Sequence, residues 1–269
     1  MKKDSIKPTN VDEFLNETRS RGRLSFGLEE LKQELQVSDK AVNQALYRAK
    51  ARNKIAQVRN GFYVILSPEY TKQGMVPTTL FIDDLMKMLN KRYYVGLVSA
   101  AALYGAAHQQ PMEYFVITQK PALRNIKNKK LKINFYVKKD WSETSIIKLK
   151  TDAGMMNVSS PELTALDLFY YQETISLNNT VTILKELAQE MKPSVLQKTG
   201  TEYPQVTAIQ RLGYILDVEL QNSKLATILQ KVLNDKKVFP AALSNNIIKE
   251  GIFNEKWKLF INTKIEADI

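Results

Sequence analysis

The stretch that most constrains the fold is residues 23–66, RLSFGLEELKQELQVSDKAVNQALYRAKARNKIAQVRNGFYVIL. Its apolar residues recur twice at the spacing of an amphipathic helix, and two β-prone runs follow. The pattern therefore predicts a helix, a turn, a second helix and a hairpin. That order is typical of a winged helix-turn-helix.

The first predicted helix carries Leu28, Leu31 and Leu35 on one face and is expected to rest on a small core. Ser38 is placed to cap the second helix, because its hydroxyl can accept a hydrogen bond from a free backbone N–H. Asp39 then opposes the positive end of the helix dipole. The second helix is therefore predicted to begin after Ser38.

The second predicted helix has an apolar stripe and a polar face opposite to it. The stripe consists of Val42, Ala45, Leu46 and Ala49. The opposite face carries Lys40, Asn43, Gln44, Tyr47, Arg48 and Ala51. Asparagine and glutamine can pair with adenine, arginine with guanine and lysine with phosphate, so this face suits a DNA major groove. The alternative is an ordinary solvated face.

The predicted wing consists of residues 55–59 and 62–66, joined at Asn60-Gly61, a dipeptide that tolerates positive φ. Arg59 is expected at its tip. From Ser38 to Gly61 six basic residues are opposed by one acidic residue. The DNA-binding residues predicted from helix and wing are Ser38, Lys40, Asn43, Gln44, Tyr47, Arg48, Lys50, Arg52, Arg59 and Asn60.

Upstream of this stretch, a short helix is predicted over residues 11–20, with Val11, Phe14 and Leu15 packing inward and Gly22 ending it. Residues 1–10 are polar and are expected to form a mobile arm that has no role, the alternative being contact with a DNA backbone. The arginines at positions 19, 21 and 23 could hold phosphates, although basic residues at a helix end also favour the helix dipole.

The chain of 269 residues is long enough for one small and one larger domain, and breakers near Pro68 and Pro77 place the boundary near Met75. The predicted domains are residues 1–75 and 76–269. A net charge of +11 favours an anionic partner. The chain has no apolar run of about 18 residues and no signal peptide, so we expect a cytoplasmic protein without a membrane partner. Zero cysteines exclude disulfides, zinc fingers and thiol catalysis.

Residues 76–269 predict a larger α+β domain with a mostly antiparallel sheet and several helices. Helices are expected from Thr78 or Thr79 to about Lys91, over 96–107, from the cap at Ser160, and over 177–190, 205–216 and 223–233. Strands are expected over 112–118, 132–137, 146–149, 155–158 and 257–262. Pro193, Gly200 and Pro204 are interpreted as breakers between helices.

The loop between the first two of those strands forms a second basic patch. Its residues are Lys120, Arg124, Lys127, Lys129, Lys130 and Lys132, followed by Lys138 and Lys139. It could contact DNA beside the winged domain, or a partner such as RNA or a nucleotide-binding protein. A solvated lysine-rich hairpin is the alternative.

The chain contains no phosphate-binding G-x-x-x-x-G-K-[ST], no G-x-G-x-x-G, no H-E-x-x-H and no G-x-S-x-G. His108, the only histidine, cannot build a two-histidine metal site and is expected to have a structural or surface role. Asp83 and Asp84 are interpreted as charges of a first helical turn. We therefore expect no catalytic residue, no metal site, no cofactor and no enzymatic activity.

Five segments in order give the chain a family resemblance: the winged segment ending in RNGFYVIL, then VGLVSAAALYGA, VSSPELTALDLFYY, IQRLGYILD and NEKWKLFINTKIEADI. Together they resemble the AbiEi family of antitoxins from type IV, abortive-infection toxin-antitoxin systems. The resemblance covers nearly the whole chain.

This resemblance implies a bacterial protein that gives phage resistance and represses its own operon by binding inverted repeats in promoter DNA. It also implies that the C-terminal domain counters a nucleotidyltransferase toxin without a stable complex. Two other classes stay open: a winged-helix regulator that responds to a small ligand, and an enzyme with an appended winged helix. The sequence leaves the oligomeric state open.

Overall fold

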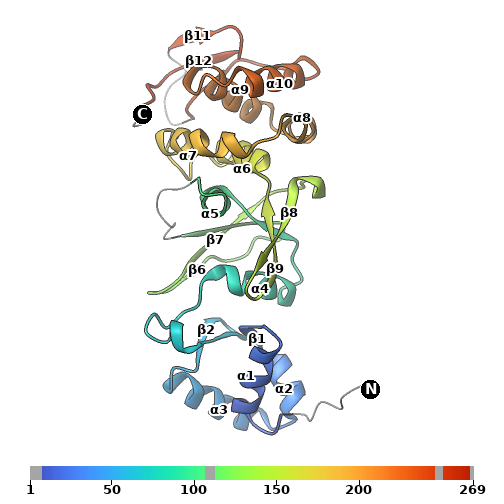
Figure 1. Cartoon of the computed structure of the whole chain (residues 1–269), viewed down its shortest axis with the longest axis vertical. Helices are drawn as coiled ribbons and strands as arrows, with labels where there is room; N and C mark the ends of the chain where they lie inside the picture. The colour runs from blue at the N-terminus through green and yellow to red at the C-terminus, as the bar shows by residue number, and fades with distance from the viewer. Residues whose placement is uncertain (1–7, 107–112, 246–250, 267–269) are drawn as a thin grey trace. The chain divides into compact units, whose positions relative to one another are not determined.

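A computed structural model of the chain describes residues 8–106, 113–245 and 251–266 (Figure 1). The chain forms two compact units. Unit 1 comprises Met1–Tyr93, Thr118–Val137 and Lys148–Asn157. Unit 2 comprises Tyr94–Ile117, Lys138–Ile147 and Val158–Ile269.

Unit 1 begins with the predicted winged segment. Its elements are α1 (Val11–Ser20), β1 (Ser25–Gly27), α2 (Leu28–Leu35), α3 (Asp39–Ala51), β2 (Ile55–Arg59) and β3 (Phe62–Ile65). The strands form one antiparallel sheet in the order β1-β3-β2. The predicted order of helix, turn, helix and hairpin is therefore present in residues 28–65. The strand β1 was not predicted, because three residues are too few to reveal a period of two.

The core of this segment forms where α1, α2 and α3 pack against the small sheet. The ring of Phe26 lies between Phe14, edge-on at 5.2 Å, and Tyr63, stacked at 5.5 Å. Leu31 and Val42 are fully buried beside them. Burial of each large apolar side chain contributes about 1.5–3 kcal/mol, so the predicted apolar stripes hold the three helices together.

The hairpin turn differs from the one predicted. Gly61 has a φ of 74°, whereas Asn60 does not lie in the left-handed region. The register of β2 and β3 shifts between Gln57 and Arg59, as in a β-bulge. The turn is therefore closed by one glycine and a bulge rather than by two residues of positive φ.

The rest of unit 1 contains the helices η1 (Pro68–Tyr70), η2 (Thr78–Leu80) and α4 (Ile82–Met88). The predicted helix from Thr78 or Thr79 to Lys91 is wrong in length, and the residue at the N-cap of α4 is Phe81 rather than a threonine. Phe81, with φ −141°, interrupts the helical backbone before α4. Asn90, with φ 49°, ends it.

Six strands form the larger sheet, in the order β6-β7-β5-β4-β9-β8. Their bounds are β4 (Tyr93–Val95), β5 (Tyr114–Thr118), β6 (Ile126–Lys127), β7 (Lys132–Val137), β8 (Ile146–Thr151) and β9 (Gly154–Ser159), and η3 (Glu143–Ser145) precedes β8. β6 and β7 pair antiparallel, but β4 and β9 pair parallel at Val95 and Val158. The sheet is thus mixed rather than wholly antiparallel. The short strands β4 and β6 were not predicted.

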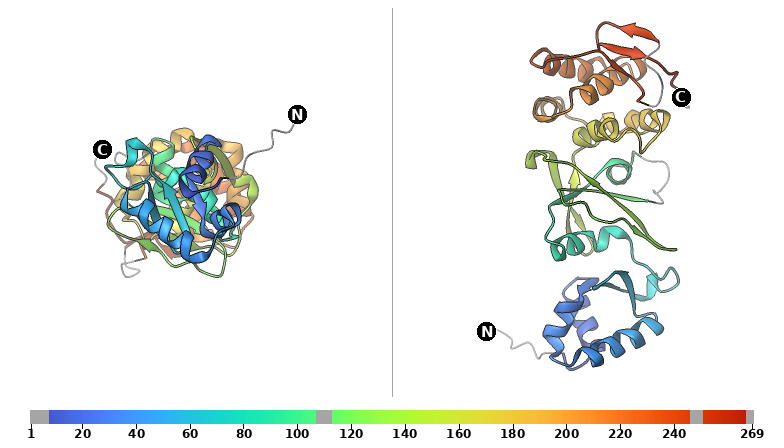
Figure 2. Two further views of the ribbon diagram at one scale, coloured as in Figure 1. Left: turned by 90° about the horizontal axis from the view of Figure 1, so that it is seen from below. Right: turned by 180° about the vertical axis from the view of Figure 1, so that it is seen from behind.

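Unit 2 is mainly helical. Its helices are α5 (Leu97–Leu103), α6 (Pro161–Tyr170), α7 (Leu177–Glu190), α8 (Pro193–Glu202), α9 (Val206–Tyr214), the π-helix η4 (Ile215–Glu219) and α10 (Ser223–Asn234). Ser160 caps α6 as predicted, its hydroxyl accepting from the Leu163 N–H at 3.2 Å. Figure 2 shows α6 and α7 side by side, with α9 and α10 beyond them. Every residue of α6 except Tyr170 is buried.

Two helices depart from the expectation. α8 was not predicted, because Pro193 and Gly200 were interpreted as breakers. Pro193 instead occupies the first turn of α8, where its missing N–H costs nothing. A Cβ at Gly200 would lie 3.5 Å from the side chain of Val232, which shows how closely α10 packs there. The helix predicted over 96–107 was too long, since the observed helix α5 ends at Leu103.

Three short strands complete unit 2: β10 (Ala241–Ala242), β11 (Ile252–Asn254) and β12 (Leu259–Ile261). β12 pairs parallel with β10 and antiparallel with β11. The strand predicted over 257–262 is therefore present but shorter. Trp257 lies just before it and is fully buried.

Candidate functional site

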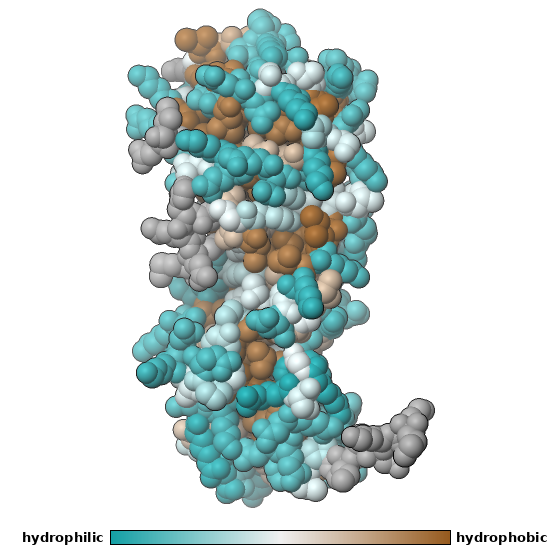
Figure 3. All heavy atoms as spheres, viewed as in Figure 1, coloured by the Kyte–Doolittle hydropathy of each residue, from teal (hydrophilic) through white to brown (hydrophobic). Residues whose placement is uncertain are grey.

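The outer face of α3 is exposed, as the helical periodicity predicted. Its polar residues Lys40, Asn43, Gln44, Tyr47, Arg48 and Arg52 are all exposed. Tyr47 is 73% exposed, which is unusual for so large a ring. Figure 3 shows a largely hydrophilic surface over α2 and α3. This face of α3 is therefore open to solvent along the length of the helix.

Two interactions hold the start of α3 in place. The Ser38 hydroxyl accepts from the Ala41 N–H at 3.3 Å, which confirms the predicted cap. Lys32 Nζ lies 2.9 Å from Asp39 Oδ1, so the acidic residue of the first turn is paired with α2. The N-terminal end of the candidate recognition helix is thereby joined to the helix that supports it.

Two of the lysines counted in the basic segment are already engaged. Lys50 Nζ donates to Gln57 Oε1 at 3.0 Å and lies 5.4 Å from the centre of the Tyr63 ring. Lys54 Nζ lies 2.7 Å from Asp12 Oδ1. Lys50 therefore joins α3 to the hairpin, and the charge presented by the face comes mainly from Lys40, Arg48 and Arg52.

The predicted wing residues differ from each other in exposure. Asn60 is exposed at the turn, whereas Arg59 is only partly exposed. Nη1 of Arg59 is buried and has no hydrogen-bond partner among the described residues. Asn60 is thus the predicted wing residue that is fully open to solvent.

The arginines after α1 are held by carboxylates, which favours the structural alternative for them. Arg21 pairs with Glu17 at 2.5 Å. Arg23 Nη1 pairs with Glu30 at 2.5 Å and its Nε with Asp84 at 3.3 Å. The hydrogen bond with Glu30 raises the pKa of Arg23. The Ser25 hydroxyl also donates to Asp84, at 2.8 Å, so Asp84 binds the winged segment.

The second basic patch lies in unit 1, around β6 and the start of β7. Lys120, Arg124, Lys127, Lys129 and Lys130 are exposed, and Lys132 is partly exposed. Nζ of Lys130 lies so close to Gly74 that a Cβ there would be 1.9 Å from it. The patch is therefore an exposed group of cations, with Lys130 resting against the backbone at residue 74.

Unit 2 contains a buried polar network that sequence reasoning did not identify. Asp167 of α6 is 0% exposed and Lys138 is 2% exposed. Lys138 Nζ donates to Asp167, and the hydroxyls of Tyr94 and Tyr203 donate to the same carboxylate at 2.5 and 2.6 Å. Lys138 Nζ also lies 4.3 Å from the centre of the Tyr203 ring. The pKa of each of the two tyrosines is raised well above its usual value. The main cause is burial, and the second is the negative charge of Asp167.

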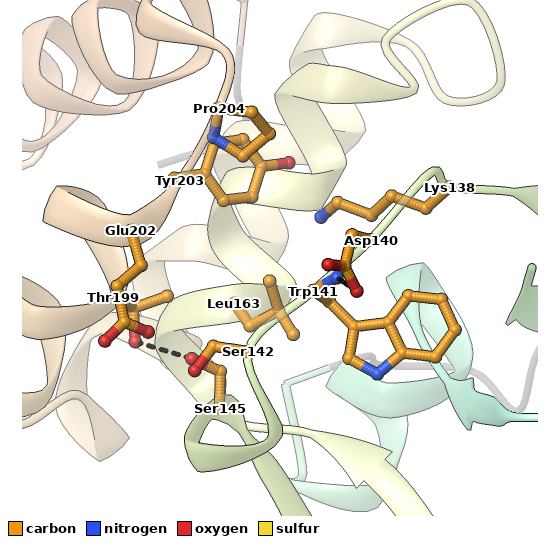
Figure 4. A pocket seen from close by; sticks show the side chains of 10 residues that line it. All are labelled: Lys138, Asp140, Trp141, Ser142, Ser145, Leu163, Thr199, Glu202, Tyr203 and Pro204. Atoms are coloured by element: carbon orange, nitrogen blue, oxygen red, sulfur yellow. Dashed lines mark hydrogen bonds between the residues drawn. The ribbon is translucent and has the colours of Figure 1, made fainter.

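A cavity of about 340 Å³ borders this network (Figure 4). Its lining residues are Lys138, Asp140, Trp141, Ser142, Ser145, Leu163, Thr199, Glu202, Tyr203 and Pro204. The Ser145 and Thr199 hydroxyls hydrogen-bond at 3.1 Å. Aromatic and aliphatic walls with a few polar groups are typical of small-molecule pockets.

The signal for this network is visible in retrospect. Asp167 stands within LTALDLF, and a charge inside an otherwise apolar helix is almost always paired when that helix is buried. Lys138 was assigned to the basic loop by its neighbours in sequence. It differs from them because it belongs to unit 2, where it is buried and bonded to Asp167.

Among the described residues, no group of three or more His, Cys, Asp or Glu is arranged to hold a metal ion. In the same ranges no helix is both long and apolar enough to cross a membrane. His108 lies outside the described residues.

The middle of the chain is similar to a known protein family. Residues 94–218 match the family model described as the AbiEi antitoxin C-terminal domain. No curated protein is significantly similar in sequence. The crystal structure of the RV2827C protein from Mycobacterium tuberculosis has a TM-score of 0.67 and 16% identity, covering 95% of this chain and 92% of that chain. At this identity the likeness shows the fold alone.

Proposed function

We propose that this chain, whose residues 94–218 match the AbiEi antitoxin C-terminal domain, is an antitoxin that also binds DNA and represses its own operon. Its operator would consist of inverted repeats in the promoter. The toxin it counters would be a nucleotidyltransferase, in a type IV, abortive-infection system that gives phage resistance, and neutralisation would not need a stable complex.

The observation that carries the DNA-binding proposal is the exposed outer face of α3. It presents Asn43, Gln44 and Arg48, whose side chains can hydrogen-bond base edges, beside Lys40 and Arg52, which can hold phosphates. The +11 net charge adds attraction to DNA that depends on salt. The second basic patch would contact DNA beside the operator half-site.

We assign DNA binding to residues 1–75 and toxin neutralisation to residues 76–269. The two activities would then respond to different substitutions. Arg48→Glu in the intact chain should abolish operator binding, because it reverses one charge on the reading face. The same variant should still rescue cells when the toxin is expressed from an unrelated promoter.

The experiment combines a mobility shift on the chain's own promoter with growth after toxin induction. Lys185→Glu is the matched control, because Lys185 is exposed on α7 of unit 2. If Arg48→Glu binds the promoter as Lys185→Glu does, the DNA-binding face is wrongly placed. If it binds no DNA and also fails to rescue growth while folded, the two activities are not separable.

The cavity beside Lys138 favours a second candidate, a winged-helix regulator that responds to a small ligand. In that case an untreated cell extract should change the operator affinity of the purified chain, and the same extract depleted of small molecules by dialysis should not. An affinity that is the same before and after dialysis of the extract argues against it.

A further inference from the structure

Unit 2 contains a second cavity, and this one is polar. It lies between the start of α9 and the residues in and around β10. Its volume is about 360 Å³. Gln205, Thr207 and Arg211 line it from α9 and its start, and Ala242 and Asn245 line it from the segment of β10. None of the proposed activities uses this cavity.

Arg211 is a buried cation that has no counterion among the described residues. It is 3% exposed, and its hydrogen bonds within those residues reach neutral acceptors. Nε and Nη2 donate to the Ala242 carbonyl at 3.0 and 2.8 Å, and Nη2 also donates to Asn245 Oδ1. Burial lowers the pKa of Arg211 to about 10, so the guanidinium is still protonated at neutral pH.

The guanidinium has unused donors. It carries five N–H groups, of which the bonds of Nε and Nη2 occupy three. The two N–H groups of Nη1 bond to no described residue. Burying a cation without an anion is costly, and an anion in the cavity would offset that cost.

The remaining walls suit an anion as well. Gln205 precedes α9 without capping it, and its Oε1 is buried with no partner among the described residues. Rotation of this amide would present its NH₂ group instead. Thr207 contributes a hydroxyl in the first turn, where the free backbone N–H groups and the helix dipole favour negative charge.

From these donors we propose that the cavity binds the phosphate group of a small molecule. A tetrahedral phosphate has enough acceptor oxygens to meet Nη1 of Arg211, the Thr207 hydroxyl and the first turn of α9 together. The cavity is larger than one phosphate, which leaves room for the group that carries it. Inorganic phosphate and a nucleoside monophosphate share this chemistry.

The test is calorimetric titration of the intact chain with sodium phosphate and, separately, with adenosine monophosphate, at constant ionic strength set by chloride. The wild type should bind both probes if the free ion suffices. It should bind adenosine monophosphate more tightly if the cavity also holds the organic part. No binding of either probe overturns the proposal.

Arg211→Met should raise the Kd about tenfold or more, the effect of losing one charged hydrogen bond. Lys231→Met removes the same charge from an exposed position of α10 and should leave the Kd unchanged. Phosphate binding that survives Arg211→Met belongs to other cations of this basic chain and contradicts the assignment.

A second variant keeps the hydrogen bonds of Arg211. Thr207→Asp places a carboxylate in the cavity and should abolish phosphate binding by repulsion. Thr227→Asp makes the same change at an exposed position of α10 and should bind like the wild type. Equal binding by the two folded aspartate variants, as checked by circular dichroism, would overturn the proposal.

Discussion

Gly213 of α9 lies directly against the ring of Trp257. A Cβ at residue 213 would lie 1.9 Å from Cζ3 of that ring, a distance at which one of the two must move. The Trp257 indole Nε1 donates to Asp217 Oδ2 at 2.9 Å, which fixes the ring in this position. The segments IQRLGYILD and NEKWKLFIN, separate in the sequence, are therefore two sides of one contact.

Gly213→Ala should destabilise the fold by about 1–3 kcal/mol, because the added methyl overpacks a closed site. Gly200→Ala is the matched control in α8. Its added Cβ would meet Val232 at the ordinary distance of 3.5 Å, and alanine favours a helix by up to about 1 kcal/mol. Urea unfolding of both variants measures the difference. Equal stabilities would show that the Trp257 ring packs loosely against α9.

Arg48→Ala should weaken operator binding by about 1–3 kcal/mol and relax one base position if the arginine reads guanine. A phosphate contact would instead weaken every sequence equally. Mobility shifts on a series of mutated operators separate these results, with Lys185→Ala as the control on an exposed helix of unit 2. Binding like wild type would remove Arg48 from the reading face.

The second basic patch is tested by replacing Lys127, Lys129 and Lys130 together with alanine. If these lysines bind phosphates, the slope of log affinity against log salt should become shallower by up to about 0.9 for each phosphate that the variant no longer binds. Fluorescence anisotropy at several salt concentrations measures that slope. An unchanged slope assigns the patch to another partner or to solvent.

The sequence was sufficient for the winged segment because local signals agree there. α1 begins at Val11 and α3 begins after the cap at Ser38, both as predicted, and the predicted stripe of Leu28, Leu31 and Leu35 lies in α2. The cap of α1 at Asn10 was not predicted. The sequence was insufficient where a long-range contact decides. Gly200 lies within α8, where α10 packs closely against it. The sequence does not reveal this neighbour, so the glycine was interpreted as a helix breaker.

The candidate site was predictable to a similar degree. The exposed face of α3 follows from the helical period alone. The engagement of Lys50 by Gln57 and the burial of Lys138 against Asp167 depend on partners distant in sequence. Charge counting cannot separate such lysines from the exposed cations beside them.

The proposed division at residue 75 is best tested in the intact chain. Asp84 binds both Arg23 and Ser25, and the Phe81 ring lies 6.3 Å from Phe62. A fragment that ends at residue 75 would lack Phe81 and Asp84. Weak DNA binding by such a fragment would therefore reflect poorer packing as well as impaired function, whereas point variants avoid this ambiguity.

The Lys138–Asp167 pair should matter far more than a surface pair. Lys138→Met leaves a buried carboxylate without its cation and should cost about 3–5 kcal/mol. Lys256→Met removes an exposed lysine that lies 2.7 Å from Asp217, and it should cost at most about 1 kcal/mol. Urea unfolding at neutral pH compares them. Similar losses would mean that solvent reaches Lys138.

The same network should make the protein sensitive to alkali. Tyr94 and Tyr203 have a raised pKa in the folded chain, chiefly because they are buried. Their contribution to the free energy of unfolding is complete below the pKa of an unfolded tyrosine, about 10, and falls as the pH rises above it. The unfolded state then releases protons that the folded state retains.

We therefore expect the free energy of unfolding to fall above about pH 10, and Tyr94→Phe to make that fall shallower. Tyr47→Phe is the control, because Tyr47 is 73% exposed and meets water in both states. Urea unfolding of the wild type and both variants from about pH 8 to 11 gives the slopes. If Tyr94→Phe loses stability with pH as steeply as Tyr47→Phe does, the Tyr94 hydroxyl is not shielded by the network around Asp167.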